Sequence, residues 1–578
     1  MYSSILKLFT ILSLKDKILF IILSILSLLA TFLELIGIGM VIPFVSIILD
    51  SNKIYDIYLI SNLIVFFNLT KTEIFIFSLL LLVIIFSIKN IFLGFFTFAK
   101  HNFIMNSNLR LTKKLSNFYF KTNYKFHLNS NSSFLIRNLQ SEVPRTNTFL
   151  QHTLFIINES ILLVGILLFI LIYNFYVFFT IIPILVTFGL SFIYLTKKFS
   201  SNWGKKQSYF DGLSFKIIME GLSNIKLAKT FNKTNFFHSI YTNFKSKKLK
   251  TDRNINTLND MPRLFLEIIA IFTFAIVLYL LYYNQNENEY ILSTIALFAV
   301  SAFKILPSIG RIITSVSNIK FHSESVEIIF NIFHNNSIET NTLKENTDNS
   351  DLTTSDENFI IIKDLSFSYD KSMSKVLENI NLNIKQGDYV GIIGKSGAGK
   401  TTLIDLMLGL LKPDKGSVKL MGKDLYDDHK KISELVGYVP QTNILADETI
   451  RQNIAFGVPD NEIRNKAIMD VIKLSNLEEL IKSLDKGINT IIGERGVRLS
   501  GGQIQRISIA RALYNNPKIL FFDEATSSLD KKTENKILED INLLKGKHTL
   551  IMITHNQETL KYCNIIYEVK NKKIRRIK

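Results

Sequence analysis

The feature that most constrains this chain is a set of long apolar stretches, all of them before residue 320 of 578. A helix needs roughly 20 apolar residues to cross the hydrocarbon core of a bilayer, which is about 30 Å thick. Six stretches meet that length: 18–49, 74–98, 153–173, 175–196, 264–283 and 290–313. The sequence therefore predicts an all-helical membrane domain with six spans. The shorter apolar segment 54–69 is predicted to be an amphipathic helix on the outer surface.

The charge of the connecting segments predicts the orientation of these spans. Residues 100–150 carry eight Lys or Arg against one acid, and residues 196–263 carry fourteen against four. The other two connections, 173–176 and 283–290, hold no basic residue. Because cationic loops stay in the cytoplasm, we expect both termini to be cytoplasmic. The basic loops are too long for turns, so helices two to five should continue below the membrane. Short elements near Tyr124–Asn131 and Glu220–Lys229 should join them.

Composition excludes several other classes of protein. The net charge is +18, but most of the excess lies in the loops between the apolar stretches, so membrane topology explains it and no nucleic-acid partner is predicted. The single cysteine, Cys563, excludes an intrachain disulfide and a multi-cysteine metal cluster. No removable signal peptide is expected at the N-terminus, because a short apolar core followed by a small-residue cleavage site is missing there.

The chain changes character after the last apolar stretch. Residues 335–357 are almost entirely polar, which is typical of a linker. Short apolar strands then alternate with helices, a pattern that predicts an α/β domain. The expected organisation is a membrane domain at 1–334, a linker at 335–357 and a soluble α/β domain at 358–578.

A phosphate-binding loop is predicted in the α/β domain. The strand Tyr389–Ile393 leads into a glycine-rich segment, and the apolar helix Leu403–Leu411 follows. Glycines let backbone N–H groups close around phosphate oxygens, and the helix N-terminus favours negative charge. Lys400 should reach the β- and γ-phosphates, and Thr401 should ligate Mg²⁺. The predicted nucleotide-binding residues here are Gly394, Lys395, Ser396, Gly397, Ala398, Gly399, Lys400, Thr401 and Thr402.

Two further motifs strengthen this prediction. The apolar strand Ile519–Phe522 ends in Asp523 and Glu524. Asp523 is placed to hold Mg²⁺ through water, and Glu524 to polarise an attacking water. The sequence Leu499-Ser500-Gly501-Gly502-Gln503 begins a helix with a serine and glycines able to bind phosphate. With these motifs in order, nearly the whole chain resembles the ABC transporter family, whose signature sequence is LSGGQ.

The resemblance implies further roles, which are carried over position by position. Tyr369 matches the aromatic residue that stacks on adenine, Gln441 the glutamine that senses Mg²⁺, and His555 the histidine that contacts the γ-phosphate. Catalysis is thus expected from Glu524, His555 and Gln441, and Mg²⁺ binding from Thr401, Gln441 and Asp523. Thr490–Gly496 resembles an exporter-specific loop, and Ser528-Leu529-Asp530 a dimer-contact loop. Asn556 departs from the family, which usually has arginine there. One ATPase domain per chain implies a homodimer.

Cations inside the apolar spans point to the transported molecule. Lys89, Lys304 and Arg311 lie within spans, and Arg263 at the mouth of the fifth. A cation at the bilayer centre costs roughly 2.5–3.5 kcal/mol, so each needs an explanation. One is snorkelling or pairing with Glu34, Glu159 or Glu267. The other is a cavity for an anionic headgroup such as pyrophosphate. Lys304 and Arg311, seven residues apart, share a helical face, which favours the cavity.

The membrane domain resembles one subfamily in particular, the PglK-type flippases. The resemblance rests on Phe32–Leu35, Val41–Phe44, Met261–Glu267 and Leu306–Ser315. It implies that ATP hydrolysis flips a polyprenyl-pyrophosphate-linked oligosaccharide outward across a bacterial inner membrane, for protein N-glycosylation. Lys89, Arg263, Lys304 and Arg311 would bind the headgroup, with lysine at two positions where that subfamily has arginine. Export of another anionic lipid or glycolipid of the lipid A type, or of drugs or peptides, remains the alternative.

Overall fold

The computed structural model describes residues 2–40, 71–173, 175–283, 288–336, 358–370, 374–426, 434–493, 496–525 and 531–578. These residues form two compact units. The first comprises Met1–Thr122 and Ser130–Glu339, and the second comprises Asn123–Asn129 and Thr340–Lys578. The short segment Asn123–Asn129 groups with the second unit. The predicted linker lies largely outside the described residues, and helix α12 extends into its first two positions.

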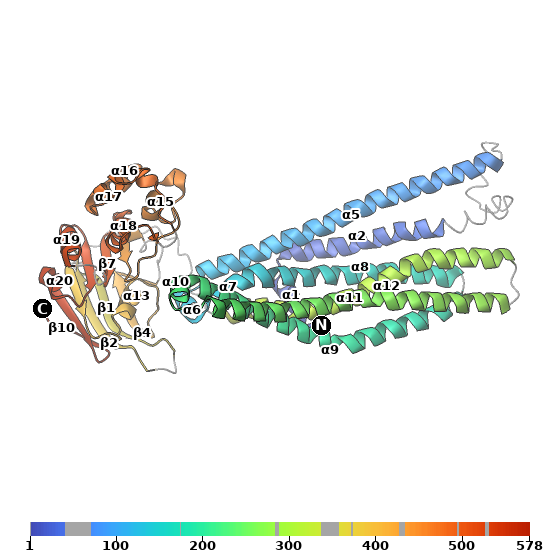
Figure 1. Cartoon of the computed structure of the whole chain (residues 1–578), viewed down its shortest axis with the longest axis horizontal. Coiled ribbons are helices and arrows are strands. Elements are labelled where there is room, and N and C mark those ends of the chain that lie inside the picture. The colour runs from blue at the N-terminus through green and yellow to red at the C-terminus, as the bar shows by residue number, and fades with distance from the viewer. Residues whose placement is uncertain are drawn as a thin grey trace. The chain divides into compact units, whose positions relative to one another are not determined.

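Long helices make up the first unit (Figure 1). α12 packs against α8, α9 and α11, and α2 packs against α5 and α8. The helices are α1 Tyr2–Ile11, α2 Leu14–Gly39, α5 Lys71–Lys121, α7 Ser132–Arg137, α8 Val143–Tyr173, α9 Phe175–Ser223, α10 Ile225–Thr230, α11 Thr234–Tyr283 and α12 Asn288–Asn336. A π-helical turn, η2 at Asn138–Glu142, joins α7 to α8, and α6 at Tyr124–Asn129 belongs to the second unit.

The helices run well beyond the apolar stretches. Within the described residues, five are long and apolar enough to cross a membrane: Leu14–Gly39, Leu79–Lys121, Ser132–Ile172, Ile182–Ser223 and Thr234–Leu280. The predicted sixth span lies in α12, many of whose side chains before Ser301 fall outside the described residues. The end of the first predicted span and the segment 54–69 also fall outside them. Short helices α6 and α10 occur where two short connecting elements were predicted.

A buried ion network joins the continuations of these helices. Glu142 is fully buried, and its Oε1 lies 3.0 Å from Arg145 and 3.6 Å from Arg137. Arg145 also contacts Asp211 of α9 at 2.8 Å, and Lys248 of α11 contacts the same carboxylate at 2.8 Å. Three largely buried cations therefore share two buried carboxylates. The network ties η2, α8, α9 and α11 together.

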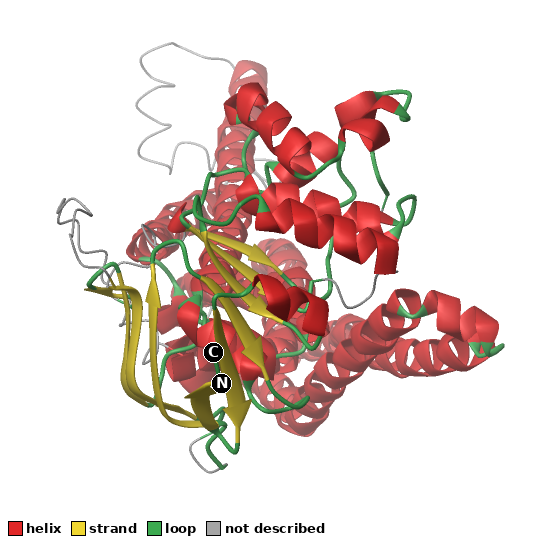
Figure 2. Cartoon of the chain, turned by 90° about the vertical axis from the view of Figure 1, so that its left-hand side faces the viewer, coloured by secondary structure: helices red, strands yellow, loops and turns green. Residues whose placement is uncertain are grey.

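The second unit contains two sheets (Figure 2). A four-stranded antiparallel sheet has the order β2-β1-β4-β5, and a six-stranded sheet has the order β10-β9-β3-β8-β7-β6. The strands are β1 Asn358–Phe367, β2 Leu377–Lys385, β3 Tyr389–Ile393, β4 Lys415–Leu420, β5 Lys423–Asp424, β6 Val436–Val439, β7 Ile519–Asp523, β8 Thr549–Ile553, β9 Ile565–Lys570 and β10 Lys573–Arg576. In the larger sheet all pairings are parallel except β9 with β10.

The central strands of the larger sheet are almost continuously apolar. Every residue of β7 and β8 is buried, as expected for parallel strands covered on both faces. Two apolar cores result, one containing Tyr389 and Phe522 and the other Val390 and Phe521. The helices are α13 Lys400–Met407, α15 Ile450–Ile454, α16 Asn465–Leu474, α17 Glu478–Lys482, α18 Gly501–Leu513, α19 Lys531–Asn542 and α20 Gln557–Tyr562.

Candidate functional site

The phosphate-binding loop follows β3 and needs its glycines. Gly394, Gly397 and Gly399 have φ values of 154°, 79° and 99°, in the region that side chains disfavour. At Gly394 a Cβ atom would also stand 2.4 Å from the carbonyl oxygen of Val569. Gly399 is the N-cap of α13, so the loop passes directly into a helix N-terminus. Backbone N–H groups there are available to an anion.

Lys400 lies at the centre of this loop. It is 6% exposed, and its Nζ donates hydrogen bonds to the carbonyl oxygens of Gly394 at 2.8 Å and Lys395 at 3.2 Å. The same atom lies 3.0 Å from His555 Nε2. Burial lowers the pKa of Lys400, while the charges of Glu524 and Asp523 oppose that shift. The loop thus holds a largely desolvated cation where phosphate oxygens would need one. Lys395, Ser396 and Gly397 are exposed around it, and Ala398 is half-buried.

The carboxyl ends of β6, β7 and β8 bring the other catalytic candidates together. Gln441 follows β6, and its Nε2 donates to Glu524 Oε2 at 2.8 Å. Glu524 follows β7 and has a φ of 46°, a left-handed conformation that is uncommon outside glycine. His555 follows β8, and its Nε2 lies 3.3 Å from Glu524 Oε1. Because β6, β7 and β8 run parallel to β3 in one sheet, Gln441, Glu524 and His555 lie at the same end of the sheet as the phosphate-binding loop.

The donor set at this edge fits a hard divalent cation. Burial and the charge of Glu524 raise the pKa of Asp523, whereas a hydrogen bond from Thr401 and the charge of Lys400 act against that shift. Burial, and then the charge of Asp523, raises the pKa of Asp405 to about 6. Hydroxyl, amide and carboxylate oxygens from Thr401, Gln441 and Asp523 are the ligand type that Mg²⁺ prefers.

Tyr369 is tied to the phosphate-binding loop. Its hydroxyl lies 3.0 Å from Thr402 Oγ1, and its ring packs edge-on against Phe367 at 5.2 Å. Tyr124 of α6 is grouped with this unit. Burial raises the pKa of Tyr124, and the charges of Asp405 and Tyr369 raise it further.

The predicted signature motif caps its own helix. Ser500 Oγ accepts a hydrogen bond from the backbone N–H of Gln503 at 3.3 Å, and Gln503 Oε1 accepts one from the N–H of Ser500 at 2.8 Å. Gly501 is exposed with open space around it, and Gly502 is half-buried. Among the described residues, no hydrogen bond or ion pair joins this motif to the loop of the same chain. Glu494, Arg495 and Ser528–Asp530 lie outside the described residues.

The predicted headgroup cations have partners in the first unit. Lys304 Nζ lies 3.4 Å from both oxygens of Glu34, and Arg311 forms a two-pronged pair with Glu159 at 2.6 and 3.0 Å. Lys89 is 5% exposed, and its Nζ lies 4.1 Å from the centre of the Phe86 ring. Lys304 thus pairs with Glu34, and the Lys89 side chain reaches α2 beside Gly37, three residues from that carboxylate.

Arg263 is not brought into this group. Its Nε contacts Glu267 at 3.1 Å on its own helix, and its side chain is 84% exposed. No contact within the described part of the chain joins it to the other three cations.

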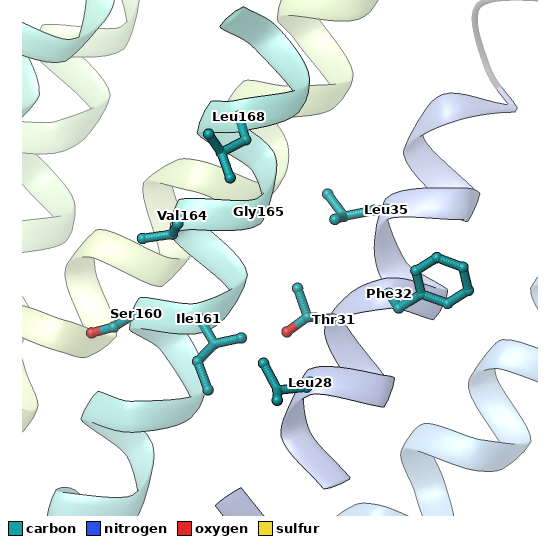
Figure 3. A pocket seen from close by; sticks show the side chains of 9 residues that line it. All are labelled: Leu28, Thr31, Phe32, Leu35, Ser160, Ile161, Val164, Gly165 and Leu168. Carbon is teal, nitrogen blue, oxygen red and sulfur yellow. The ribbon is translucent and has the colours of Figure 1, made fainter. Parts of the chain in front are cut away.

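The helices that carry Glu34 and Glu159, α2 and α8, pack closely against each other. Gly165 of α8 faces Thr31 and Leu35 of α2, and a Cβ on Gly165 would come within 3.0 Å of Leu35 (Figure 3). Beside this approach is a groove of about 440 Å³, lined by Leu28, Thr31, Phe32, Leu35, Ser160, Ile161, Val164, Gly165 and Leu168. Glu34 and Glu159 adjoin groove residues in sequence but pair with cations of α12.

One cation of this region was missed by the sequence reasoning. Lys100 of α5 was counted only among the basic loop residues, yet its Nζ lies over the rings of Phe96 and Phe155, at 4.7 and 5.6 Å. The sequence feature that could have identified Lys100 is its spacing of eleven residues from Lys89. Eleven residues are about three helical turns, which puts both lysines on one face of the helix.

Comparisons with known proteins agree with this architecture. Residues 17–306 match the ABC transporter transmembrane region, and residues 377–527 match the ABC transporter model. A solved bacterial Atm1-family ABC exporter with ATP bound has the same fold, with a TM-score of 0.75, 19% identity, and coverage of 97% of this chain and 94% of that one.

Two relatives are more similar in sequence but over a shorter length. The leukotoxin translocation ATP-binding protein LktB of Mannheimia haemolytica is 42% identical over 204 residues, and that of Mannheimia glucosida over 203. Each match covers 35% of this chain and only 28% of the relative.

Proposed function

Because the chain belongs to the ABC transporter family, with an exporter-type membrane domain and an ATPase domain whose hydrolysis of ATP is coupled to transport, we propose that it exports an amphiphile with an anionic headgroup. The specific cargo we propose is a polyprenyl-pyrophosphate-linked oligosaccharide. It would pass from the cytoplasmic to the outer leaflet of a bacterial inner membrane and serve protein N-glycosylation. Two chains would act as a homodimer, with the ATPase domains and all termini in the cytoplasm.

The observation that carries the cargo proposal is the surplus of positive charge within the membrane helices. Lys304 and Glu34 form one pair, but Lys89 beside them is buried and forms no ion pair with a described residue. An uncompensated cation in a bilayer is costly and marks a functional site by default. A phosphorylated headgroup supplies the missing negative charge. The apolar groove between α2 and α8 is compatible with an amphiphile rather than a hydrophilic solute.

The ATPase site supports defined roles for its residues. Lys400 would exchange its two carbonyl partners for phosphate oxygens, and Tyr369 would stack on adenine. Glu524, which accepts a hydrogen bond from the Gln441 amide and lies close to His555, would polarise the attacking water and take its proton. Bound by Thr401, Gln441 and Asp523, Mg²⁺ would neutralise phosphate charge.

Closure of the site requires a second chain. Ser500, Gly501, Gly502 and Gln503 present a helix N-terminus to solvent and could bind the phosphates held by the loop of the other chain.

Protein or peptide secretion is the second candidate. The leukotoxin translocation proteins favour it, since they are 42% identical over about 204 residues. That match leaves about two thirds of this chain unmatched, so it carries less weight than the cations of the membrane unit. Export of a lipid A-type glycolipid is a variant of the first proposal, because it needs the same anion-binding groups.

The test is transport in proteoliposomes that contain a fluorescent polyprenyl-pyrophosphate oligosaccharide. Its loss from the leaflet facing the ATPase domains should require ATP and should stop in Glu524→Gln. Lys304→Ala with Arg311→Ala should lower the amount flipped per ATP hydrolysed at least about tenfold, a loss of roughly 1.4 kcal/mol. ATP hydrolysis without movement of this probe, combined with movement of a peptide probe, would reject the lipid proposal in favour of secretion.

A further inference from the structure

Four cations of the membrane unit are arranged in two groups along the same pair of helices. Lys89 and Lys100 lie about three turns apart on α5, and Lys304 and Arg311 about two turns apart on α12. α5 and α12 each contribute one cation to each group, and a third helix contributes a carboxylate. We call the groups the Glu34 cluster (Lys89, Lys304, Glu34) and the Glu159 cluster (Lys100, Arg311, Glu159).

The Glu34 cluster is compact. Lys304 Nζ is 3.4 Å from the Glu34 carboxylate, and the charges of both residues act on Lys89. The Lys89 side chain crosses to α2, where its Nζ would be 3.4 Å from a Cβ atom at Gly37, one turn from Glu34. The Oε2 atom of Glu34 is buried and accepts no hydrogen bond from a described residue. Two cations therefore share one incompletely satisfied carboxylate.

The Glu159 cluster repeats this composition. Arg311 holds Glu159 with two nitrogens, and Ser308 Oγ lies 3.3 Å from the same guanidinium. Lys100 reaches α8 at Phe155, one turn before Glu159, and the charges of Glu159 and Arg311 both act on it. Lys100 forms no ion pair or hydrogen bond with a described residue. Its half-buried ammonium instead lies over two aromatic rings, which is a weaker compensation than a carboxylate.

Each cluster thus has two cations to one carboxylate and a net charge of about +1. We propose that the Glu159 cluster is a second anion-binding site, in which Lys100 contacts the phosphate groups of the cargo before they reach the Glu34 cluster. α5 runs from Lys71 toward the basic segment that follows residue 100, so Lys100 and Arg311 lie on the cytoplasmic side of Lys89 and Lys304. Glu159 holds Arg311 in place and limits the positive charge until an anion arrives. This inference rests on the proposed function.

Charge variants of the full-length protein in lipid nanodiscs test it. The readout is the concentration of polyprenyl pyrophosphate that half-maximally stimulates ATP hydrolysis, with phosphate-free polyprenol as the blank. Lys100→Gln should raise this concentration about tenfold, and Lys100→Arg should keep it within about twofold. Lys113→Gln, an exposed lysine farther along α5, is the matched control and should leave it unchanged.

A second substitution separates charge from structure. Glu159→Gln should lower the half-saturating concentration, because the cluster then carries about +2. Lys100→Gln combined with Glu159→Gln should return it to near the wild-type value, since the net charge is about +1 again. A purely structural role for these residues would instead make the double variant worse than either single one.

The outcomes distinguish this inference from the proposed function. If wild type responds to lipid A and not to polyprenyl pyrophosphate, the proposed cargo is wrong, and the same charge order measured with lipid A still supports the cluster. If wild type responds but Lys100→Gln behaves like Lys113→Gln, the cluster is wrong and the cargo stands. A wild type that responds to neither anionic amphiphile refutes both.

Discussion

The buried ion network around Glu142 gives a stability prediction with a definite size. Glu142 is fully buried, and its Oε1 accepts a hydrogen bond from Ser208 at 2.7 Å in addition to its contacts with Arg145 and Arg137. Glu142→Gln keeps the shape of the side chain but removes the charge. Three largely buried cations, Arg137, Arg145 and Lys248, are then left with the single carboxylate of Asp211, which pairs with Arg145 and Lys248. Removing one partner from a buried pair costs about 3–5 kcal/mol.

The expected result is a lower midpoint of thermal unfolding for the first unit. At roughly 2–4 °C per kcal/mol for a large domain, the shift is about 10 °C. It can be measured by scanning fluorescence of the purified protein in one detergent at fixed protein concentration. The matched control is Glu220→Gln, which removes an exposed pair with Lys216 at 3.8 Å. Exposed pairs contribute less than about 1 kcal/mol, so this variant should shift the midpoint by only a degree or two.

A double variant tests whether charge is the cause. Glu142→Gln with Arg137→Gln restores the original net charge of the network, about +1, and should recover at least half of the lost midpoint. The reasoning would be refuted if Glu142→Gln shifted the midpoint no more than Glu220→Gln. It would also fail if removing Arg137 as well produced a further loss equal to the first, because the two changes would then act independently.

Three further predictions concern the α/β unit. Glu524→Gln should slow ATP hydrolysis at least about 100-fold while a fluorescent ATP analogue still binds, and loss of binding would contradict its proposed role. Gly394→Ala should abolish nucleotide binding, because its Cβ would lie 2.4 Å from the Val569 oxygen. In Gly397→Ala the new Cβ has open space around it, so the variant should be destabilised by only about 1–2 kcal/mol of backbone strain. Burial raises the pKa of Cys563 to about 11, so its thiolate fraction at pH 8 is about 100-fold below that of an ordinary thiol. Maleimide should therefore label it only after unfolding, and labelling of the native protein within minutes would show that the thiol is accessible.

The sequence by itself determined those features whose physics is local. Hydropathy depends on residues adjacent in the chain, so the apolar stretches could be predicted without a fold, while the orientation that loop charge predicts stays a prediction. The phosphate-binding loop could be predicted for the same reason, since a strand, a glycine-rich turn and a helix N-terminus are contiguous. Even the short helices at Tyr124–Asn129 and Ile225–Thr230 fall where the length of the basic loops called for a connection. The continuation of the helices below the membrane could also be predicted, because the basic loops are too long to be turns.

Tertiary structure decided every relation between residues on different helices and strands. The sequence showed Lys304, Arg311, Glu34 and Glu159 but not which cation pairs with which carboxylate, because that depends on how α12 packs against α2 and α8. Lys100 looked like an ordinary loop lysine until its helix brought it over Phe155. The role of His555 could be expected from the sequence, but only the parallel strands that end side by side show that it lies between Lys400 and Glu524. Ion pairs and hydrogen bonds act over a few ångströms, and only the packed chain brings such distant residues that close.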